Sequence, residues 1–121
     1  MDMNVHVITD NQFSNYSAKS VTIKNIEYNS NIIVTNDTIV NFACNNIKQL
    51  NNNHVEQIIS LNPDLVIFGT GDKIVYPELN IIHELQKKNI GIEVMNIQAL
   101  CRTFNFLVSE NRKVVAILFF I

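Results

Sequence analysis

The sequence contains no tryptophan, only three glycines and two prolines, and no apolar run long enough to cross a membrane. Its longest apolar run, Val114 to Ile121, is far shorter than the roughly 20 residues that a membrane helix needs. Basic residues are also few, since nine Lys and Arg stand scattered among eleven Asp and Glu. Because no Lys/Arg stripe could neutralise a run of phosphates, the composition disfavours binding to nucleic acid.

Residues 1–16 carry Asp2 and Asp10 and lack the basic stretch and apolar core of a signal peptide. We therefore expect a cytoplasmic protein in which Cys44 and Cys101 are free thiols, because that compartment does not sustain structural disulfides. The three histidines lie far apart, and none stands at metal-ligand spacing from Cys, Asp or Glu. The sequence thus predicts neither a disulfide nor a metal site.

A chain of 121 residues is the right size for one domain with a substantial core. Residues 1–18 are polar and show no stable period, which predicts a loosely ordered N-terminal arm. Residues 19–121 carry the apolar runs and are predicted to form a single domain. The sequence requires no internal domain boundary.

The rest of the chain is organised around one short apolar run, Asp64 to Phe68, which follows Pro63 and stops at Gly69. A run of this length is too short for a helix and is typical of a strand covered on both faces, as in parallel sheets. Ligands of such sheets bind beyond the carboxyl ends of the strands. The loop from Gly69 to Lys73 is therefore the first candidate site.

Upstream of this run, apolar residues predict three strands, at residues 21–28, 31–35 and 38–42. The first and second of these strands are expected to pair. Asn36 and Asp37 separate the second from the third and favour a hairpin, because both residue types tolerate a positive φ. The prediction is an N-terminal antiparallel β-meander.

One helix is predicted before the central run and one after it. The first begins with Asn53 as its cap, and Glu56 reaches back to complete a capping box. The second spans Glu78 to Lys88 and ends at Asn89, which takes the left-handed position that follows a helix. Its inward face is expected to consist of Leu79, Ile82 and Leu85.

A third helix, Ile97 to Ser109, is predicted with Asn96 as its cap. Further strands are expected at residues 90–95 and 114–120. The element order is three strands followed by three helix–strand units. This order predicts a three-layer α/β domain with a mixed central sheet.

The loop that begins at Gly69 matches neither common nucleotide motif. Ile74 stands where a dinucleotide fingerprint needs a small residue, and no Ser or Thr follows the lysine as in a P-loop. One interpretation is a tight strand-to-helix turn. The alternative is a small-anion site whose exposed amides and ammonium group come from Gly69, Thr70, Gly71 and Lys73.

The third helix carries the other candidate residues. Cys101 lies on its apolar face, where a thiol behaves as a small hydrophobe, and a nucleophilic role would need a special environment. Arg102 and Thr103 lie near the helix start, and the guanidinium could complete an anion site beside the glycine loop. A solvated or structurally paired Arg102 is the alternative.

Several segments together resemble a known family: Asp64-Leu-Val-Ile-Phe-Gly-Thr-Gly, Pro77, Gly91-Ile-Glu-Val-Met-Asn and Ala99-Leu-Cys-Arg-Thr-Phe-Asn-Phe-Leu. The chain is similar here, over residues 21–118, to a domain-of-unknown-function family of bacteria and archaea. The mitochondrial relative of that family assists assembly of respiratory complex I, the NADH dehydrogenase. The resemblance implies a compact three-layer α/β domain and no reaction, cofactor or catalytic residue. It suggests a shared pocket formed by Gly69, Thr70, Gly71, Cys101, Arg102, Thr103 and Asn105.

Two classes of function remain open from the sequence. The resemblance implies a non-catalytic assembly or interaction factor for complex I or another membrane complex, which would meet a protein partner in the cytoplasm or at the inner membrane. The alternative is a small-molecule enzyme or anion-binding module that uses the Gly-Thr-Gly loop with Arg102, with or without Cys101. The sequence leaves the oligomeric state open.

Overall fold

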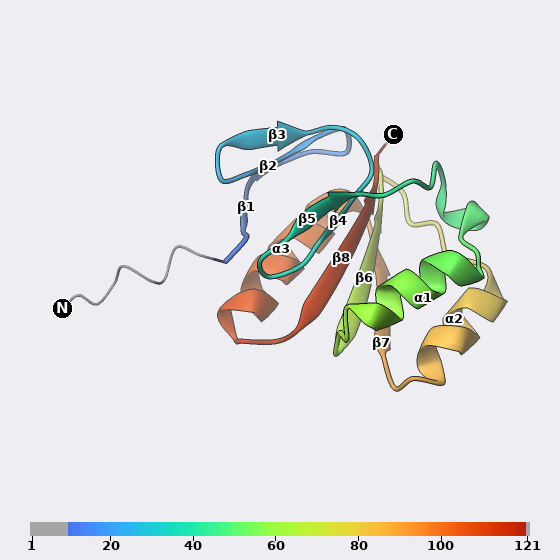
Figure 1. Cartoon of the computed structure of the whole chain (residues 1–121). Helices are drawn as coiled ribbons and strands as arrows, with labels where there is room; N and C mark the ends of the chain where they lie inside the picture. Colours follow the sequence, from blue (N-terminus) through green and yellow to red (C-terminus); the bar gives the residue numbers. More distant parts are fainter. Residues whose placement is uncertain (1–9, 121) are drawn as a thin grey trace.

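The structure, a computed structural model, describes residues 10–120 of the chain, and Figure 1 shows how its elements are arranged. The elements, in chain order, are β1 (Phe13–Tyr16), β2 (Val21–Ile23), β3 (Ile26–Tyr28), β4 (Ile32–Val34), β5 (Ile39–Asn41), the 3-10 helix η2 (Ile47–Gln49), α1 (Asn52–Ser60), β6 (Leu65–Thr70), α2 (Leu79–Gln86), β7 (Gly91–Met95), α3 (Ile97–Ser109) and β8 (Val114–Phe119).

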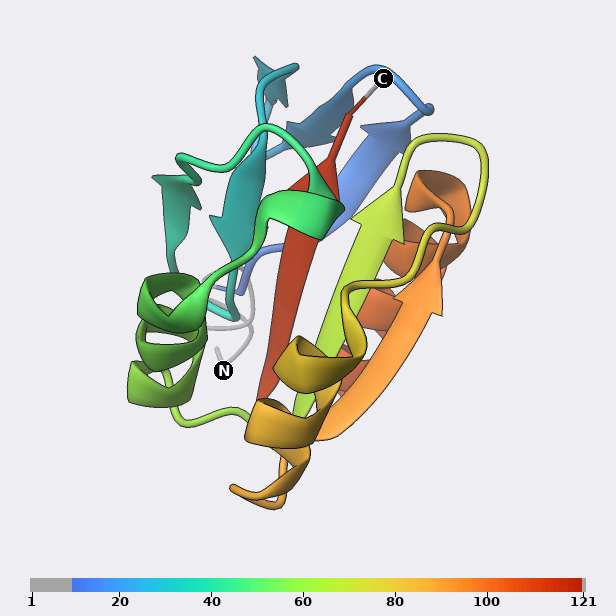
Figure 2. The same ribbon diagram turned by 90° about the vertical axis from the view of Figure 1, so that its right-hand side faces the viewer.

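The main sheet contains five strands in the order β5-β4-β8-β6-β7. Strands β8, β6 and β7 run parallel, whereas β4 pairs antiparallel with both β8 and β5. Parallel neighbours need crossover connections, which α2 and α3 supply. Helices α1 and α2 cover one face of the sheet and α3 covers the other (Figures 1 and 2). The predicted three-layer α/β domain with a mixed sheet is therefore confirmed.

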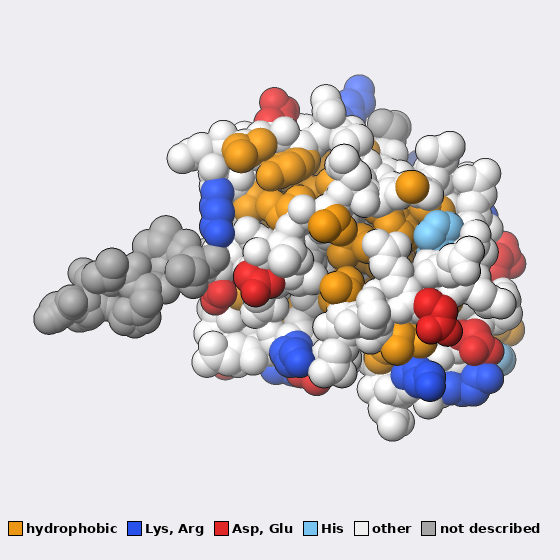
Figure 3. All heavy atoms as spheres, viewed as in Figure 1, with side chains coloured by type: hydrophobic (Ala, Val, Ile, Leu, Met, Phe, Trp, Pro, Cys, Tyr) orange, Lys and Arg blue, Asp and Glu red, His pale blue; other side chains and the backbone are white. Residues whose placement is uncertain are grey.

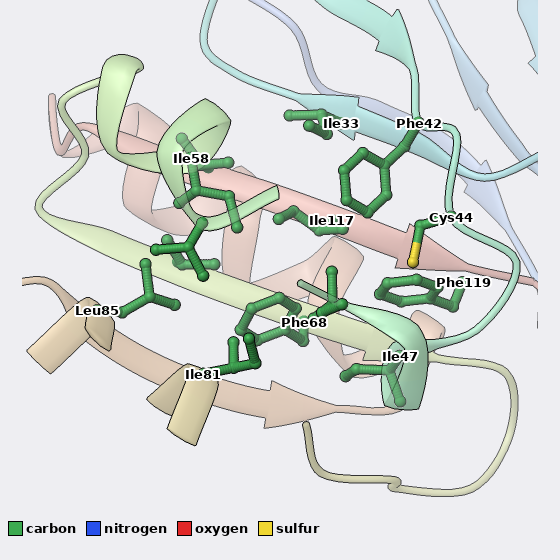
Figure 4. Close-up of a cluster of buried hydrophobic side chains, with 14 of the residues drawn as sticks. Ile33, Phe42, Cys44, Ile47, Ile58, Phe68, Ile81, Leu85, Ile117 and Phe119 are labelled. Atoms are coloured by element: carbon green, nitrogen blue, oxygen red, sulfur yellow. The ribbon is translucent and has the colours of Figure 1, made fainter. Parts of the chain in front are cut away.

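Strand β6 lies at the centre of the core. Successive side chains of a strand point to opposite faces, so β6 contributes to both hydrophobic clusters. Val66 and Phe68 enter the cluster beneath α1 and α2, while Ile67 enters the cluster beneath α3. Figure 4 shows Phe68 beneath the two helices, in the cluster that also contains Ile81, Leu85 and Ile117. The short apolar run is thus a strand buried on both faces, as predicted, although β8 rather than β6 is the middle strand of the five.

The segment predicted as one strand over residues 21–28 is instead a hairpin. Lys24 and Asn25 have φ angles of 50° and 68°, which place both residues in the left-handed region and reverse the chain between β2 and β3. This two-residue turn suits the right-handed twist of the flanking strands. The predicted pairing of this segment with residues 31–35 is wrong, because β2 pairs with β1 and β3 while β4 pairs with β5 and β8.

The predicted N-terminal arm, residues 1–18, contains a strand. Residues Phe13–Tyr16 form β1, which pairs antiparallel with β2 and completes a separate three-stranded sheet. Phe13 is buried, and its ring meets the ring of Phe104 edge-on at a centroid distance of 5.2 Å. Residues 1–9 of the predicted arm lie outside the described residues. The hairpin predicted at Asn36 and Asp37 is present between β4 and β5.

The helix starts follow the sequence signals with one shift. Asn51, rather than Asn53, caps α1, and its side-chain oxygen accepts hydrogen bonds from the backbone N–H groups of Asn53 and His54. The Nδ1 atom of His54 then accepts from the backbone N–H of Asn51 at 3.0 Å, in the place predicted for Glu56. Asn96 caps α3 as predicted and accepts from the N–H of Ala99 at 2.8 Å.

The inward face of α2 differs from the prediction. Ile81 and Leu85 are buried, Ile82 is half-buried, and Leu79 is 65% exposed. The helix begins only at Leu79, so its first residue projects from the end of the helix instead of facing the sheet. Asn89 does take the predicted left-handed conformation, with a φ of 60°.

Charged side chains are dispersed over the surface that Figure 3 shows. Lys and Arg side chains on this face are interleaved with Asp and Glu, most visibly over α1 and α2. Exposed hydrophobic side chains gather on the same face between the small sheet and the main sheet. This face therefore offers no continuous basic stripe of the kind that tracks a nucleic-acid backbone.

Candidate functional site

A pocket of about 380 Å³ lies at the carboxyl ends of β6 and β8. Its volume falls within the range of small-molecule sites, and its position is the one at which α/β sheets bind ligands. Four residues of the loop singled out from the sequence, Thr70 to Lys73, line it, together with the segment before α1 and the end of β8. Its lining includes Asn45, Lys48, Thr70, Gly71, Lys73 and Phe120.

Thr70 fixes the shape of the loop on one side of this pocket. Its hydroxyl donates a hydrogen bond to the carbonyl oxygen of Lys73 at 2.5 Å and accepts one from the backbone N–H of Val75 at 3.0 Å. Both hydrogen-bonding functions of the hydroxyl are thereby used within the loop. The role that the structure gives Thr70 is to hold the turn that shapes the pocket wall.

The two glycines of the loop serve different purposes. A side chain at Gly69 would place its Cβ atom 2.7 Å from Cδ1 of Leu100, so glycine lets α3 approach β6 closely. Gly71 has a φ of 36°, its N–H donates to the carbonyl of Phe119 at 2.9 Å, and its carbonyl accepts from the N–H of Ile97 at 2.9 Å. The amide of Gly71 is therefore engaged in tying β6 to β8 and is not directed at a ligand.

The charges of the pocket come mainly from two lysines. Lys48 lies 3.7 Å from a carboxylate oxygen of Glu78, with both side chains about half exposed, so this ion pair is weak. Lys73 is exposed and has no ion-pair partner among the residues that the structure describes. Asp72 also lines the pocket, which leaves it with mixed charge and one unpaired ammonium group.

Cys101 is fully buried on the inner face of α3. Burial raises the pKa of its thiol well above the ordinary value, and the positive charge of the neighbouring Arg102 lowers that pKa only in part. A nucleophilic cysteine needs the opposite shift, because the thiolate is the reactive form. Cys44 is also free and buried, its thiol donates to the carbonyl of Asn46 at 3.2 Å, and burial likewise raises its pKa.

We expect Cys101 to react slowly with a thiol reagent in the native protein. At pH 8 its alkylation, followed by peptide-resolved mass spectrometry, should be at least about tenfold slower than in the denatured chain, because each unit of raised pKa removes about nine-tenths of the thiolate. Cys44, which is slightly more exposed, serves as the internal comparison. Native labelling of Cys101 as fast as that of the unfolded chain would restore the case for a reactive thiol.

The remaining candidates on α3 do not line the pocket. The side chain of Asn105 forms two hydrogen bonds with the backbone of β1. Its oxygen accepts from the N–H of Phe13 at 2.8 Å, and its nitrogen donates to the carbonyl of Phe13 at 2.9 Å. Arg102 is exposed and Thr103 is half-buried. The structure thus brings together Thr70, Gly71 and Lys73 at the pocket. Asn105 instead connects the small sheet to α3 through its hydrogen bonds to Phe13.

The sequence did not indicate that the segment before α1 forms one wall of the pocket. Asn45, Asn46 and Lys48 lie in the asparagine-rich segment between β5 and α1, and all three line the pocket. Asn31 holds this wall in place, because its side chain donates to the carbonyl of Cys44 at 2.8 Å and accepts from the N–H of Phe120 at 2.9 Å. A concentration of asparagines was the available signal, but it does not indicate which of them bond to distant backbone groups.

Residues 10–120 show no sign of a metal-binding cluster or of a membrane-spanning helix. In this part of the chain, no group of three or more His, Cys, Asp or Glu side chains could hold a metal ion. No helix formed by these residues is long and apolar enough to cross a membrane.

Comparison with known proteins gives a consistent result. The chain is 32% identical over 94 residues to the 13 kDa major membrane protein of Francisella tularensis, a match that covers 76% of each protein. It is 29% identical over 105 residues to NADH dehydrogenase [ubiquinone] 1 alpha subcomplex assembly factor 3 of Xenopus tropicalis, and the match covers 85% of this chain but only 57% of that protein.

A solved structure shares the fold. An NMR structure of a Xanthomonas campestris protein matches with a TM-score of 0.85 and 23% identity, covering 98% of this chain and 92% of that one. The family model described as "Protein of unknown function (DUF498/DUF598)" matches residues 13–119. Because this match spans nearly all of the described elements, the chain belongs to the DUF498/DUF598 family.

Proposed function

We propose that this chain is a non-catalytic interaction factor that assists the assembly of respiratory complex I or of another membrane complex. The observation that carries the proposal is the segment from Ile74 to Leu79, formed by the end of the loop after β6 and the first residue of α2, in which large apolar side chains face solvent. Ile74, Tyr76 and Leu79 are 53%, 58% and 65% exposed. We call these three residues the loop surface.

Exposed apolar side chains scattered singly are common, but three within six residues concentrate exposed apolar area in one short segment. Aromatic and large aliphatic side chains supply most of the binding free energy of protein interfaces. Val75, between two of them, lines the pocket, so a partner that covers the loop surface could also place a side chain in the pocket.

The relatives support this direction. The assembly factor of Xenopus is named for its part in building NADH dehydrogenase, and the Francisella relative is named as a membrane protein. Because the chain spans 57% of the Xenopus protein, the partners of that protein are proposed for this chain rather than transferred to it. A position at the membrane would follow from attachment to a partner.

The proposal is tested by replacing the loop surface with serine at Ile74, Tyr76 and Leu79. In cells from which the gene has been deleted, this triple variant should restore less than about a tenth of the assembled complex that the wild-type chain restores, because each lost apolar contact weakens binding by about 1 kcal/mol or more. Assembly is measured by native gel electrophoresis, with in-gel NADH dehydrogenase activity for complex I and protein staining for the other membrane complexes.

The matched control replaces three exposed apolar residues elsewhere, Ile26, Val40 and Phe106, with serine. Both triple variants should keep the wild-type melting temperature within a few degrees, since exposed side chains contribute little to stability. Equal loss of assembly in both variants, or full assembly in the deletion strain, would contradict the proposed function.

A further inference from the structure

Strand β7 is an edge of the main sheet as residues 10–120 form it. It pairs with β6 along its whole length, from Gly91 opposite Leu65 to Met95 opposite Gly69, and no strand from this part of the chain lies on its other side. The N–H of Gly91 donates to the carbonyl of Asp64 at 3.0 Å, so the odd-numbered residues of β7 direct their backbone groups toward β6. The N–H and C=O groups of Ile92 and Val94 therefore point away from the sheet.

This edge has few of the features that normally block strand addition. Sheet edges are usually protected by proline, charged side chains, a bulge or a covering segment. The register of β7 is continuous over five residue pairs, and β7 contains no proline and a single charged side chain, that of Glu93. Within residues 10–120, no hydrogen bond reaches the outward groups of Ile92 and Val94 from another segment.

The side chains of β7 define what an added strand would meet. Ile92 and Val94 are half-buried against the cluster beneath α1 and α2, so a neighbouring apolar side chain would cover them further. Glu93 is exposed and projects toward the opposite face, the one covered by α3. In an antiparallel addition, the residue opposite Glu93 would form a close, non-hydrogen-bonded pair with Cα atoms about 4.5 Å apart.

A second copy of this chain is a poor occupant of the edge. The antiparallel register that pairs all five residues of β7 with a second β7 sets Glu93 directly against its own counterpart. Like charges directly opposite each other destabilise a strand pair. Registers shifted to avoid this contact lose strand pairs and hydrogen bonds. Charge complementarity favours a partner that carries a basic residue at this position.

We propose that β7 accepts, as an added strand, an extended segment of a partner protein in which a Lys or Arg is flanked by two apolar residues. This inference rests on the proposed interaction function and names the chemistry of the partner. Backbone hydrogen bonds to Ile92 and Val94 supply the attachment, and Glu93 supplies the selectivity.

The test uses the blocked peptide Thr-Val-Lys-Val-Thr and its counterpart with Glu in place of Lys, titrated into the protein and followed by NMR. The wild-type chain should prefer the Lys peptide by about fivefold, and a Glu93→Lys variant should prefer the Glu peptide by a similar factor. A Glu27→Lys control, on β3 of the separate sheet, should keep the wild-type preference. A Lys peptide with both valines N-methylated should not bind, because it lacks the backbone donors.

Amide exchange gives an independent measurement. In the free protein the amides of Ile92 and Val94 should exchange quickly while that of Glu93 is protected, and the Lys peptide should slow the first two. A peptide preference that Glu93→Lys leaves unchanged, or binding that survives N-methylation, would overturn the inference. A stable dimer with these amides already protected would also overturn it, because a second copy would then fill the edge.

The outcomes separate this inference from the proposed function. If the peptide preference is absent while the loop-surface variant still loses assembly, strand addition fails and the assembly role stands. If the preference reverses as expected while assembly is normal in the deletion strain, the strand-addition site stands and the assembly role fails.

Discussion

A Phe68→Asp variant is expected to lack a folded domain under conditions in which the wild-type chain is native. The Phe68 side chain is fully buried between β6 and the helices α1 and α2, so the substitution removes the largest side chain of this strand and buries a carboxylate. Loss of a buried phenylalanine costs about 3–5 kcal/mol, and a buried carboxylate without a partner costs several more. The sum approaches or exceeds the total stability of a typical domain, about 5–15 kcal/mol.

The measurement is a thermal unfolding curve by circular dichroism, for which Phe106→Asp is the control. Phe106 lies on α3 and is 63% exposed, so the same change there should shift the melting temperature by only a few degrees. A Phe68→Asp chain that unfolds at the wild-type temperature would show that Phe68 lies outside the core.

The elements that sequence reasoning located well are those whose signals are local. For α3, the asparagine cap and the apolar period of the helix lie within one stretch of chain, and the predicted bounds agree with the structure. The same is true of β6, whose apolar run identifies a strand buried on both faces. In both cases the side chains that define the element are also the side chains that it buries.

The small sheet was missed because its determinants are not local. The turn between β2 and β3 uses Lys24 and Asn25 at positive φ without a glycine, so the usual hairpin signal is absent. Strand β1 is held by Asn105 and Phe104, which lie about 90 positions further along the chain. A polar N-terminal segment looks like an arm until those distant partners are known.

The candidate site also combines features that local sequence signals predict with features that depend on distant contacts. The position of the pocket at the end of β6 follows from the general behaviour of parallel strands, and the sequence identified that loop. Arg102 was grouped with the loop because it lies near the start of its helix, and Cys101 was added through the family resemblance. The structure places neither residue at the pocket wall. Which face of a helix meets which loop depends on packing angles that no local pattern encodes.

The close approach of Leu100 to Gly69 shows that a glycine of this motif can be required for packing alone, and it leads to the second large expected effect. A Gly69→Val variant should be destabilised by about 3 kcal/mol. The added Cβ would lie 2.7 Å from Cδ1 of Leu100, whose side chain is fully buried and has little room to move. Overpacking of this kind typically costs about 1–3 kcal/mol, and the branched valine adds further bulk.

The cause is tested by a double-mutant cycle with Leu100→Ala, measured by urea denaturation. Leu100→Ala alone removes buried apolar atoms and should cost about 2–5 kcal/mol, but it also vacates the space that the valine needs. The double variant should therefore be more stable than the sum of the two single effects predicts, by about 0.5–3 kcal/mol.

Gly91→Val is the control, because its Cβ would meet Leu65 at 3.2 Å at the exposed start of β7, and it should cost less than Gly69→Val. Strict additivity in the cycle would mean that the glycine is required for a reason other than the close approach of α3 to β6.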